Sequence, residues 1–181
     1  MKWMVASDIH GSAYWCEKLV EAFRREKADR LLLLGDILYH GPRNPLPKGH
    51  NPQKCAALLS ELKDCTVSVR GNCEAAVDQV MLPFPVMADY ILLDLGRRLV
   101  FATHGDQWDE NDPPAMAKGG VLLCGHTHVS ACAEHDDFLY LNPGSVSLPK
   151  DEGHRGYILL DADGAVFKEL DGTEYRRCRF A

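Results

Sequence analysis

The sequence has no long apolar run and no cysteine pair of the CxxC type. No stretch approaches the roughly 18 apolar residues of a membrane-spanning helix, and residues 1–7 are too few for the apolar region of a signal peptide. The seven cysteines are odd in number and scattered along the chain. We therefore expect a cytoplasmic protein without a membrane span, in which most cysteines are small apolar core residues.

The sequence also has little positive charge, with a net charge of -6. It contains no basic strip interleaved with aromatic residues, so neither long nucleic acid nor an anionic membrane is an expected partner. An anionic substrate would need locally placed positive charge. The 181 residues, 46% of them hydrophobic, predict one domain over residues 1–181.

Four consecutive leucines, Leu31–Leu34, run into Gly35 and Asp36. Such an apolar run is typical of a strand buried on both faces. Residues 3–7 predict an earlier strand that ends before Asp8 and His10, with a helix from Ser12 between the two. This βαβ unit would bring Asp8, His10 and Asp36 to the same edge of a sheet. Taken alone, an aspartate after glycine more often caps a turn or the next helix.

The rest of the chain predicts a helix opening at Asn51 and Pro52, after a loop over residues 39–51 that is rich in glycine and proline. Further strands are predicted at 65–69, 89–95, 98–103, 121–124, 138–141, 156–161 and 165–170. Hairpin turns are expected at Gly96 and Gly164. The first half is α/β and the second mostly β, which predicts two packed sheets flanked by helices.

Metal-ligand side chains follow five of the predicted strands directly. They are Asp8, His10, Asp36, Asn72, His104, His126 and His128. Each alone has an ordinary explanation as a turn or surface residue. Together they predict a site beyond the carboxyl ends of the strands, where the Asp-x-His and His-x-His spacings direct both side chains to one side. Two ions that share one bridging carboxylate would use all seven.

This order of motifs resembles the calcineurin-like metallophosphoesterase superfamily over nearly the whole chain. The loop 40–47 and Cys73 resemble the small bacterial phosphodiesterases of the YfcE type within it. The resemblance implies an α/β fold that is a four-layer αββα sandwich, with two mixed β-sheets flanked by helices. It also implies hydrolysis of small phosphodiesters by a metal-bound hydroxide at a dinuclear centre.

The resemblance further implies roles for individual residues. Asp8, His10 and His128 resemble the ligands of one ion, and Asn72, His104 and His126 those of the other, with Asp36 as the bridge. Asp36, Asn72, His104 and Cys73 would form the catalytic set. Mixed imidazole and carboxylate ligation favours Mn²⁺, with Fe²⁺ and Zn²⁺ as alternatives. A homo-oligomer is expected from the resemblance only.

Cys73 departs from the wider superfamily, many of whose members have histidine after the asparagine ligand. A thiol donates protons and hydrogen bonds poorly, so we expect a preference for esters with good leaving groups. A packed, inert Cys73 is the alternative. Arg43 and Cys73 are candidate substrate-binding residues, and Arg70 is a weaker one.

Smaller roles are expected for the remaining polar residues of interest. His40 would orient a ligand, and Thr127 would hold the turn between His126 and His128. The other histidines, His50, His135 and His154, are expected at the surface.

Three alternatives to a phosphodiesterase remain open. A phosphomonoesterase or a nuclease would use the same metal chemistry. A non-catalytic scaffold of the same fold, like the related retromer subunit, would be free to lose ligands.

Overall fold

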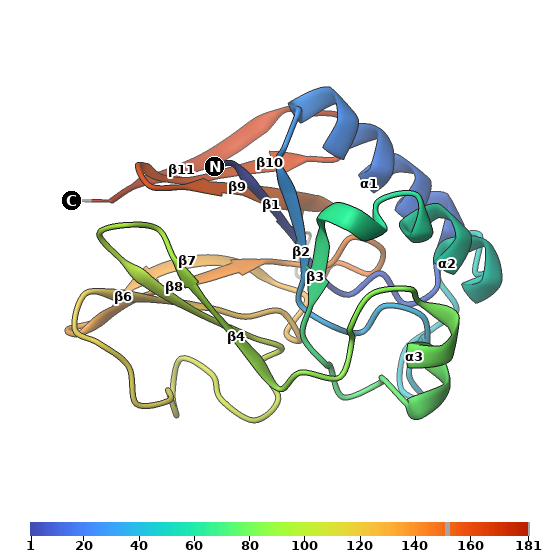
Figure 1. Ribbon diagram of the computed structural model, residues 1–181, viewed down its shortest axis with the longest axis horizontal. Helices are drawn as coiled ribbons and strands as arrows, with labels where there is room; N and C mark the ends of the chain where they lie inside the picture. Colours follow the sequence, from blue (N-terminus) through green and yellow to red (C-terminus); the bar gives the residue numbers. More distant parts are fainter. Residues whose placement is uncertain (151–152, 181) are drawn as a thin grey trace.

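The computed structural model describes residues 1–150 and 153–180 of the chain and contains two packed β-sheets (Figure 1). The first sheet has the order β11-β10-β9-β1-β2-β3, with strands Glu174–Arg179, Gly164–Glu169, Gly156–Asp161, Trp3–Ala6, Arg30–Leu33 and Thr66–Ser68. The second has the order β4-β5-β6-β8-β7, with strands Tyr90–Asp94, Leu99–Thr103, Gly120–Leu123, Phe138–Pro143 and Ser130–Glu134. Each sheet mixes parallel and antiparallel neighbours, as expected.

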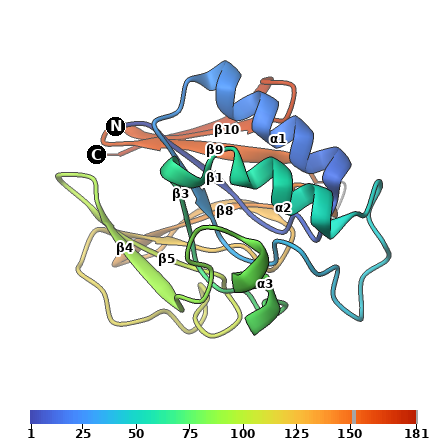
Figure 2. The same ribbon diagram turned by 45° about the vertical axis from the view of Figure 1, so that its right-hand side comes forward.

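Two helices cover the outer face of the first sheet, as Figures 1 and 2 show. Helix α1 (Ala13–Glu26) begins after Ser12, whose hydroxyl accepts a hydrogen bond from the N–H of Trp15 at 3.2 Å. Helix α2 (Pro52–Ser60) begins after Asn51, which caps it in the same way. Both starts agree with the sequence prediction. None of the helices in the described part of the chain is long and apolar enough to cross a bilayer.

The four leucines of Leu31–Leu34 are buried on both faces of the first sheet. Leu31 and Leu33 pack toward the two helices, and Leu32 and Leu34 pack into the core between the sheets. Full burial of one leucine side chain contributes about 1.5–3 kcal/mol to folding. This strand therefore holds both cores together and fixes the position of Asp36 at its end.

The outer face of the second sheet packs against Trp108 and Met116. Both belong to the connection between β5 and β6, residues 104–119, which forms neither helix nor strand. Pro113 and Pro114 within it lack backbone donors, which prevents regular structure there. The layer on this side is therefore coil, whereas helices form the layer on the other side.

Strands β7 and β11, the helix α3 (Ala76–Met81) and a short 3₁₀ helix at Lys63–Cys65 were not predicted from the sequence. β7 contains small and polar residues without β-branched side chains, and β11 is an edge strand rich in arginine. Helix α3 is short, and Ala75 at its start offers no capping side chain. The predicted hairpins at Gly96 and Gly164 are confirmed.

Candidate metal centre and active site

The turns after β1 and β2 lie side by side because the two strands are parallel neighbours. The N–H of Asp8 donates to the backbone oxygen of Gly35 at 3.2 Å. The N–H of His10 donates to that of Asp36 at 2.9 Å. The two turns are thus hydrogen-bonded to each other, and they bring the three polar side chains together as the βαβ pattern predicted.

Most of the candidate ligands have left-handed backbone conformations. In the described chain six non-glycine residues have positive φ, and five of them are Asp8, His10, Asp36, His126 and His128, with φ between 51° and 64°. Such a conformation costs a non-glycine residue of order 1–3 kcal/mol. It turns each side chain sharply away from its strand and toward the common site. The fold therefore gives up stability to place these groups.

The first group of donors consists of Asp8, His10 and His128, all buried. The Oδ1 atom of Asp8 lies 3.5 Å from Nε2 of His10 and 3.3 Å from Nε2 of His128. The two Nε2 atoms lie 3.1 Å apart. Three ligand atoms thus converge on one point, and they come from both sheets, since His128 follows β6.

The second group surrounds Nε2 of His104. Oδ1 of Asp36 lies 3.5 Å from this atom, Oδ1 of Asn72 lies 3.1 Å away, and Nδ1 of His126 lies 3.2 Å away. His104 is fully buried, whereas Asn72 is exposed. The structure therefore brings all seven sequence-predicted ligands into two adjoining groups.

Three histidines present one ring nitrogen to the backbone and the other to the site. They are His10, His104 and His128, whose Nδ1 atoms lie 2.8, 2.6 and 2.7 Å from the backbone oxygens of Tyr39, Leu34 and Leu148. A carbonyl oxygen only accepts, so each Nδ1 carries a proton and each neutral ring leaves Nε2 unprotonated. That is the tautomer in which Nε2 binds a metal.

These unprotonated nitrogens face other acceptors. The lone pairs of His10 and His128 Nε2 repel each other at 3.1 Å unless a cation or a proton lies between them. The buried Oδ1 of Asp8 receives no hydrogen bond from the described residues. Buried acceptors without donors are costly unless a cation compensates them. The donor set therefore fits divalent metal ions.

The charges of the site couple metal binding to protonation. Burial by itself raises the pKa of Asp8, but His10 and His128 outweigh it and hold the pKa well below its ordinary value. Burial lowers the pKa of His126, with His104 as a second cause, so His126 is neutral at pH 7. Despite burial, nearby carboxylates raise the pKa of His10 and His104. Protons and metal ions thus compete for these two rings.

Glu74 supports the site, although no role was predicted for it from the sequence. Its carboxylate accepts hydrogen bonds from the backbone N–H groups of Asp36 at 2.8 Å, Ile37 at 2.7 Å and Gly71 at 2.5 Å. Burial, together with the charge of Asp36, raises the pKa of Glu74 to about 7. It thereby holds the turn after β2 against the turn after β3. The only sequence signal was an acidic residue after Gly71, Asn72 and Cys73.

Two serines were also missed. The hydroxyl groups of Ser145 and Ser147 donate to the backbone oxygen of Asp8 at 2.8 and 3.1 Å. Both are buried and follow β8 in the second sheet. They stabilise the left-handed turn at Asp8 from across the sandwich. Nothing in the local sequence indicates that these hydroxyl groups reach the backbone of Asp8.

The donor groups open into a pocket of about 930 Å³. Arg43 and Cys73 line it, as expected of substrate-binding residues, and so does Lys150. Arg70 does not line the pocket, because its guanidinium forms an ion pair with Asp89 at 2.9 Å. The substrate role considered for Arg70 is therefore not supported.

The thiol of Cys73 is protonated at neutral pH. Burial, with the charges of Asp36 and Glu74, raises its pKa far above the ordinary value. Its backbone N–H donates to Oδ1 of Asp36 at 2.9 Å. Cys73 therefore orients Asp36 through its backbone and presents an uncharged side chain to the pocket.

The remaining sequence predictions have mixed outcomes. Thr127 holds its turn, since its hydroxyl oxygen accepts hydrogen bonds from the N–H of Val129 and the side chain of Asn142. His154 is exposed and pairs with Glu169.

Two other histidines expected at the surface are half-buried. His50 packs edge-on against His40, and His135 stacks on Phe138, with ring centroids 5.3 and 4.5 Å apart. These aromatic contacts explain the burial. In the structure His40 has no hydrogen bond to any of the candidate ligands.

The calcineurin-like phosphoesterase superfamily domain matches residues 1–165 of the chain. Phosphodiesterase YfcE of Escherichia coli is 42% identical over 163 residues, which cover 90% of this chain and 89% of the relative. The solved structure of YfcE superposes over 100% of both chains with a TM-score of 0.96 and 38% identity. A probable metallophosphoesterase of Bacillus subtilis, YsnB, is 26% identical over 96% of this chain and 94% of the relative.

More distant structures share only the fold. Vps29 of Entamoeba histolytica superposes over 100% of both chains with a TM-score of 0.65 at 18% identity. The two-sheet architecture is thus shared with proteins of low sequence identity, and the fold alone does not establish the activity. On the match over residues 1–165 and the 42% identity with YfcE, the chain belongs to the calcineurin-like phosphoesterase superfamily.

Proposed function

We propose that this protein is a phosphodiesterase that hydrolyses small phosphodiesters with two divalent metal ions. Asp8, His10 and His128 hold one ion in this proposal, and Asn72, His104 and His126 hold the other. Asp36 bridges them. The family implies divalent metals, and the donor atoms described above fit them. The name of the relative YfcE supports a diester as the substrate.

The arrangement around Asp36 carries the proposal. Its Oδ2 atom lies 3.7 Å from Nε2 of His10, in the first group. Its Oδ1 atom lies 3.5 Å from Nε2 of His104, in the second group. The two oxygens of one carboxylate thus face two different groups of donors, which is the placement a bridging ligand requires.

The chemistry divides between the ions and the protein. When bound, two divalent cations activate water as a nucleophile and neutralise the charge of the phosphoryl oxygens. The protein holds the imidazole tautomers through backbone carbonyls and orients Asp36 through the N–H of Cys73. Arg43, at the edge of the pocket, supplies a guanidinium for a phosphoryl oxygen. Mixed nitrogen and oxygen ligation favours Mn²⁺, with Fe²⁺ or Zn²⁺ as alternatives.

Metal-reconstituted turnover tests the proposal. Bis(p-nitrophenyl) phosphate, a diester, and p-nitrophenyl phosphate, the matching monoester, are compared after loading with Mn²⁺, Fe²⁺ or Zn²⁺. We expect turnover of the diester, highest with Mn²⁺, and little turnover of the monoester. Asp36→Asn should lose the activity, and Asp136→Asn, at an exposed acidic position, should retain it.

Each other outcome selects a different function. Preference for the monoester would favour a phosphomonoesterase. Cleavage of long single-stranded DNA at a rate comparable with that of the diester would favour a nuclease. If the protein neither binds metal nor turns over either substrate, the enzyme function is refuted and the non-catalytic scaffold is favoured.

A further inference from the structure

A second cleft lies at the other end of the strands from the metal donors. Its volume is about 890 Å³, comparable with that of the active-site pocket. Lys2 lines it at the start of β1, whereas Asp8 follows the end of the same strand, roughly 20 Å away at the rise of an extended chain. The cleft is therefore separate from the site of phosphodiester chemistry.

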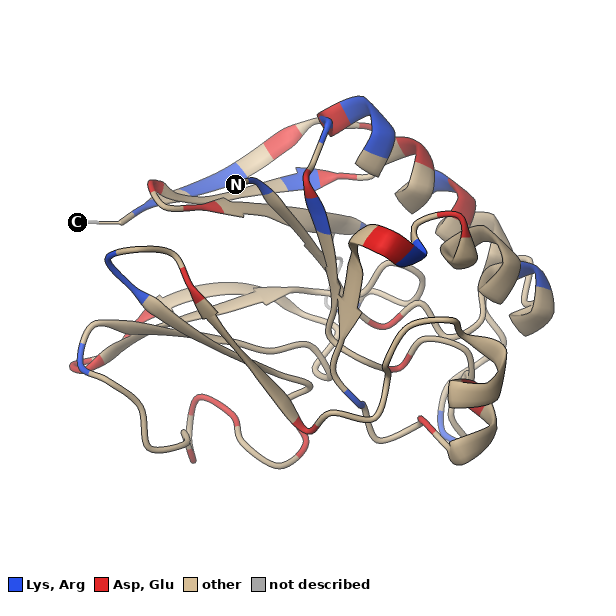
Figure 3. Ribbon diagram, in the orientation of Figure 1, with Lys and Arg blue, Asp and Glu red and all other residues tan. Residues whose placement is uncertain are grey.

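Basic residues from distant parts of the sequence converge on this cleft. They are Lys2, Arg97, Arg98, Arg177 and Arg179, against two carboxylates, Asp161 and Asp163. Figure 3 shows the basic residues at the β4–β5 turn and along β11. In a chain with a net charge of -6, this excess is a local reversal of sign. A cleft of this kind attracts anions.

Two of the arginines are available to a ligand. Arg177 is held by Glu174 at 2.7 Å, and Lys2 donates to the backbone oxygen of Glu26 at 3.0 Å. Arg97 and Arg179 are exposed, and their guanidinium groups have no hydrogen bond or ion pair with the residues that the structure describes. Guanidinium groups in this state can bind a carboxylate or sulfonate with two parallel hydrogen bonds.

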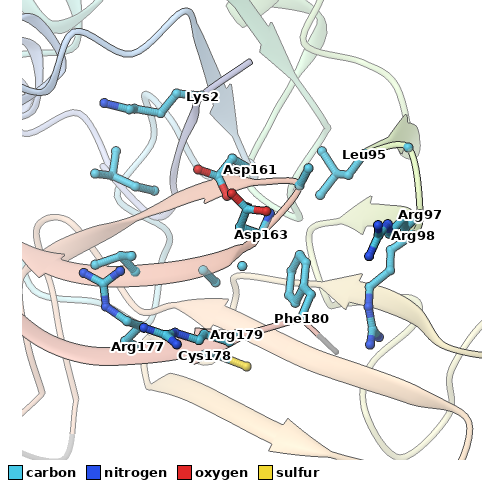
Figure 4. A pocket seen from close by; sticks show the side chains of 16 residues that line it. Lys2, Leu95, Arg97, Arg98, Asp161, Asp163, Arg177, Cys178, Arg179 and Phe180 are labelled. Carbon is cyan, nitrogen blue, oxygen red and sulfur yellow. The ribbon is translucent and has the colours of Figure 1, made fainter.

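Apolar side chains lie between these charges. Leu95 and Phe180 line the cleft and are half-buried. Arg97 and Arg98 come from the β4–β5 turn on one side of Phe180, and Arg179 comes from β11 on the other (Figure 4). The guanidinium of Arg98 lies 5.2 Å from the centre of the Phe180 ring. A ligand here meets an apolar surface between two cationic ends.

We propose that this cleft binds a small amphiphilic anion, a carboxylate or sulfonate attached to an apolar chain or ring. The charged group binds at one of the two cationic ends, to Arg97 or to Arg179, and Leu95 and Phe180 contact the apolar part. The volume fits a ligand of this size. The site needs no metal ion and is independent of the proposed phosphodiesterase activity.

Calorimetric titration of the full chain with decanoate tests the site. We expect a dissociation constant below about 1 mM, weaker binding of butanoate, and no binding of inorganic sulfate or decyltrimethylammonium at that concentration. The variant Arg97→Gln/Arg179→Gln should bind decanoate about tenfold or more weakly. The control Arg24→Gln/Arg30→Gln removes the same charge from exposed positions elsewhere and should bind like the wild type.

The rate of cysteine alkylation shows whether the ligand binds in this cleft. Cys178 lines the cleft, and Cys65 is half-buried outside it. Decanoate should slow the alkylation of Cys178 by iodoacetamide, measured by peptide mass spectrometry, and leave that of Cys65 unchanged. The proposal is overturned if decanoate does not bind, if sulfate or the cationic amphiphile binds equally well, or if the Arg97→Gln/Arg179→Gln variant binds normally. Equal protection of both cysteines would also overturn it.

Discussion

The carboxylate of Glu74 accepts the backbone N–H of Asp36 at 2.8 Å, so a residue outside the donor groups fixes the proposed bridging ligand. In Glu74→Gln one acceptor oxygen becomes an NH₂ group facing backbone donors. We expect a loss of about 1–3 kcal/mol in the free energy of unfolding. Urea unfolding of the metal-free protein measures it. Glu61→Gln, at an exposed residue paired with Arg24, is the control, and an equal effect of both changes would contradict the supporting role.

Replacement of Asp36 should release both ions. In Asp36→Asn the amide keeps the size of the side chain and loses the negative charge that two cations would share. Elemental analysis after gel filtration should find neither ion near full occupancy, whereas Asp136→Asn should retain both. Retention of one ion at full occupancy in Asp36→Asn would show that Asp36 serves a single ion.

We expect the thiol of Cys73 to limit the leaving groups that the site can handle. It is uncharged and a weak donor, whereas imidazolium at this position can protonate an alkoxide. We expect Cys73→His to extend turnover to alkyl phosphodiesters and cyclic nucleotides while aryl diesters are still hydrolysed. Comparison of kcat/KM on one aryl and one alkyl diester measures this effect, with Cys73→Ser as control. If Cys73→His and the wild type show the same aryl-to-alkyl ratio, Cys73 has no part in the chemistry.

Glu26 gives the fold a pH dependence outside the metal centre. Burial raises the pKa of Glu26, but Lys168 at 2.9 Å and Tyr157 at 2.7 Å outweigh it, so the folded pKa lies below the unfolded one. The stabilisation is complete above the unfolded value of about 4.3 and is lost as pH falls through the folded pKa.

Glu26→Gln should therefore destabilise the protein by about 1–2 kcal/mol at pH 7. The difference should diminish as the pH falls through the folded pKa of Glu26. Urea unfolding at pH 7 and at acidic pH measures it. Glu21→Gln, at an exposed pair with Lys18, should show little change at either pH. A difference for Glu26→Gln that does not depend on pH would contradict the ionic origin.

The strong apolar patterns of the sequence predicted most of the fold. Leu31–Leu33 lie in β2 and Leu34 follows it, all buried, and the two predicted hairpin turns lie at Gly96 and directly before Gly164. The missed strand β11 has little apolar pattern, because it lies at the edge of its sheet and pairs with β10 alone. The pairing of an edge strand such as β11 depends on its tertiary contacts, so its local sequence pattern does not predict it.

In the site, too, residues with a local sequence pattern could be predicted, whereas residues that act through tertiary contacts could not. Asp8 and His104 could be found because each follows an apolar strand directly. Glu74 and Ser145 act on backbone groups that are distant in the sequence, so their partners become visible only in three dimensions. Arg70 was a weaker candidate than Arg43, and its ion pair with Asp89 could not be predicted from the local sequence.

The left-handed backbone of Asp8, His10, Asp36, His126 and His128 would suit glycine better than any of these residues. Selection for thermal stability alone would therefore drift toward glycine at these five positions and erase the donors one by one. Aspartate and histidine at these positions thus carry a backbone cost that glycine would not, while their donor atoms meet at one site.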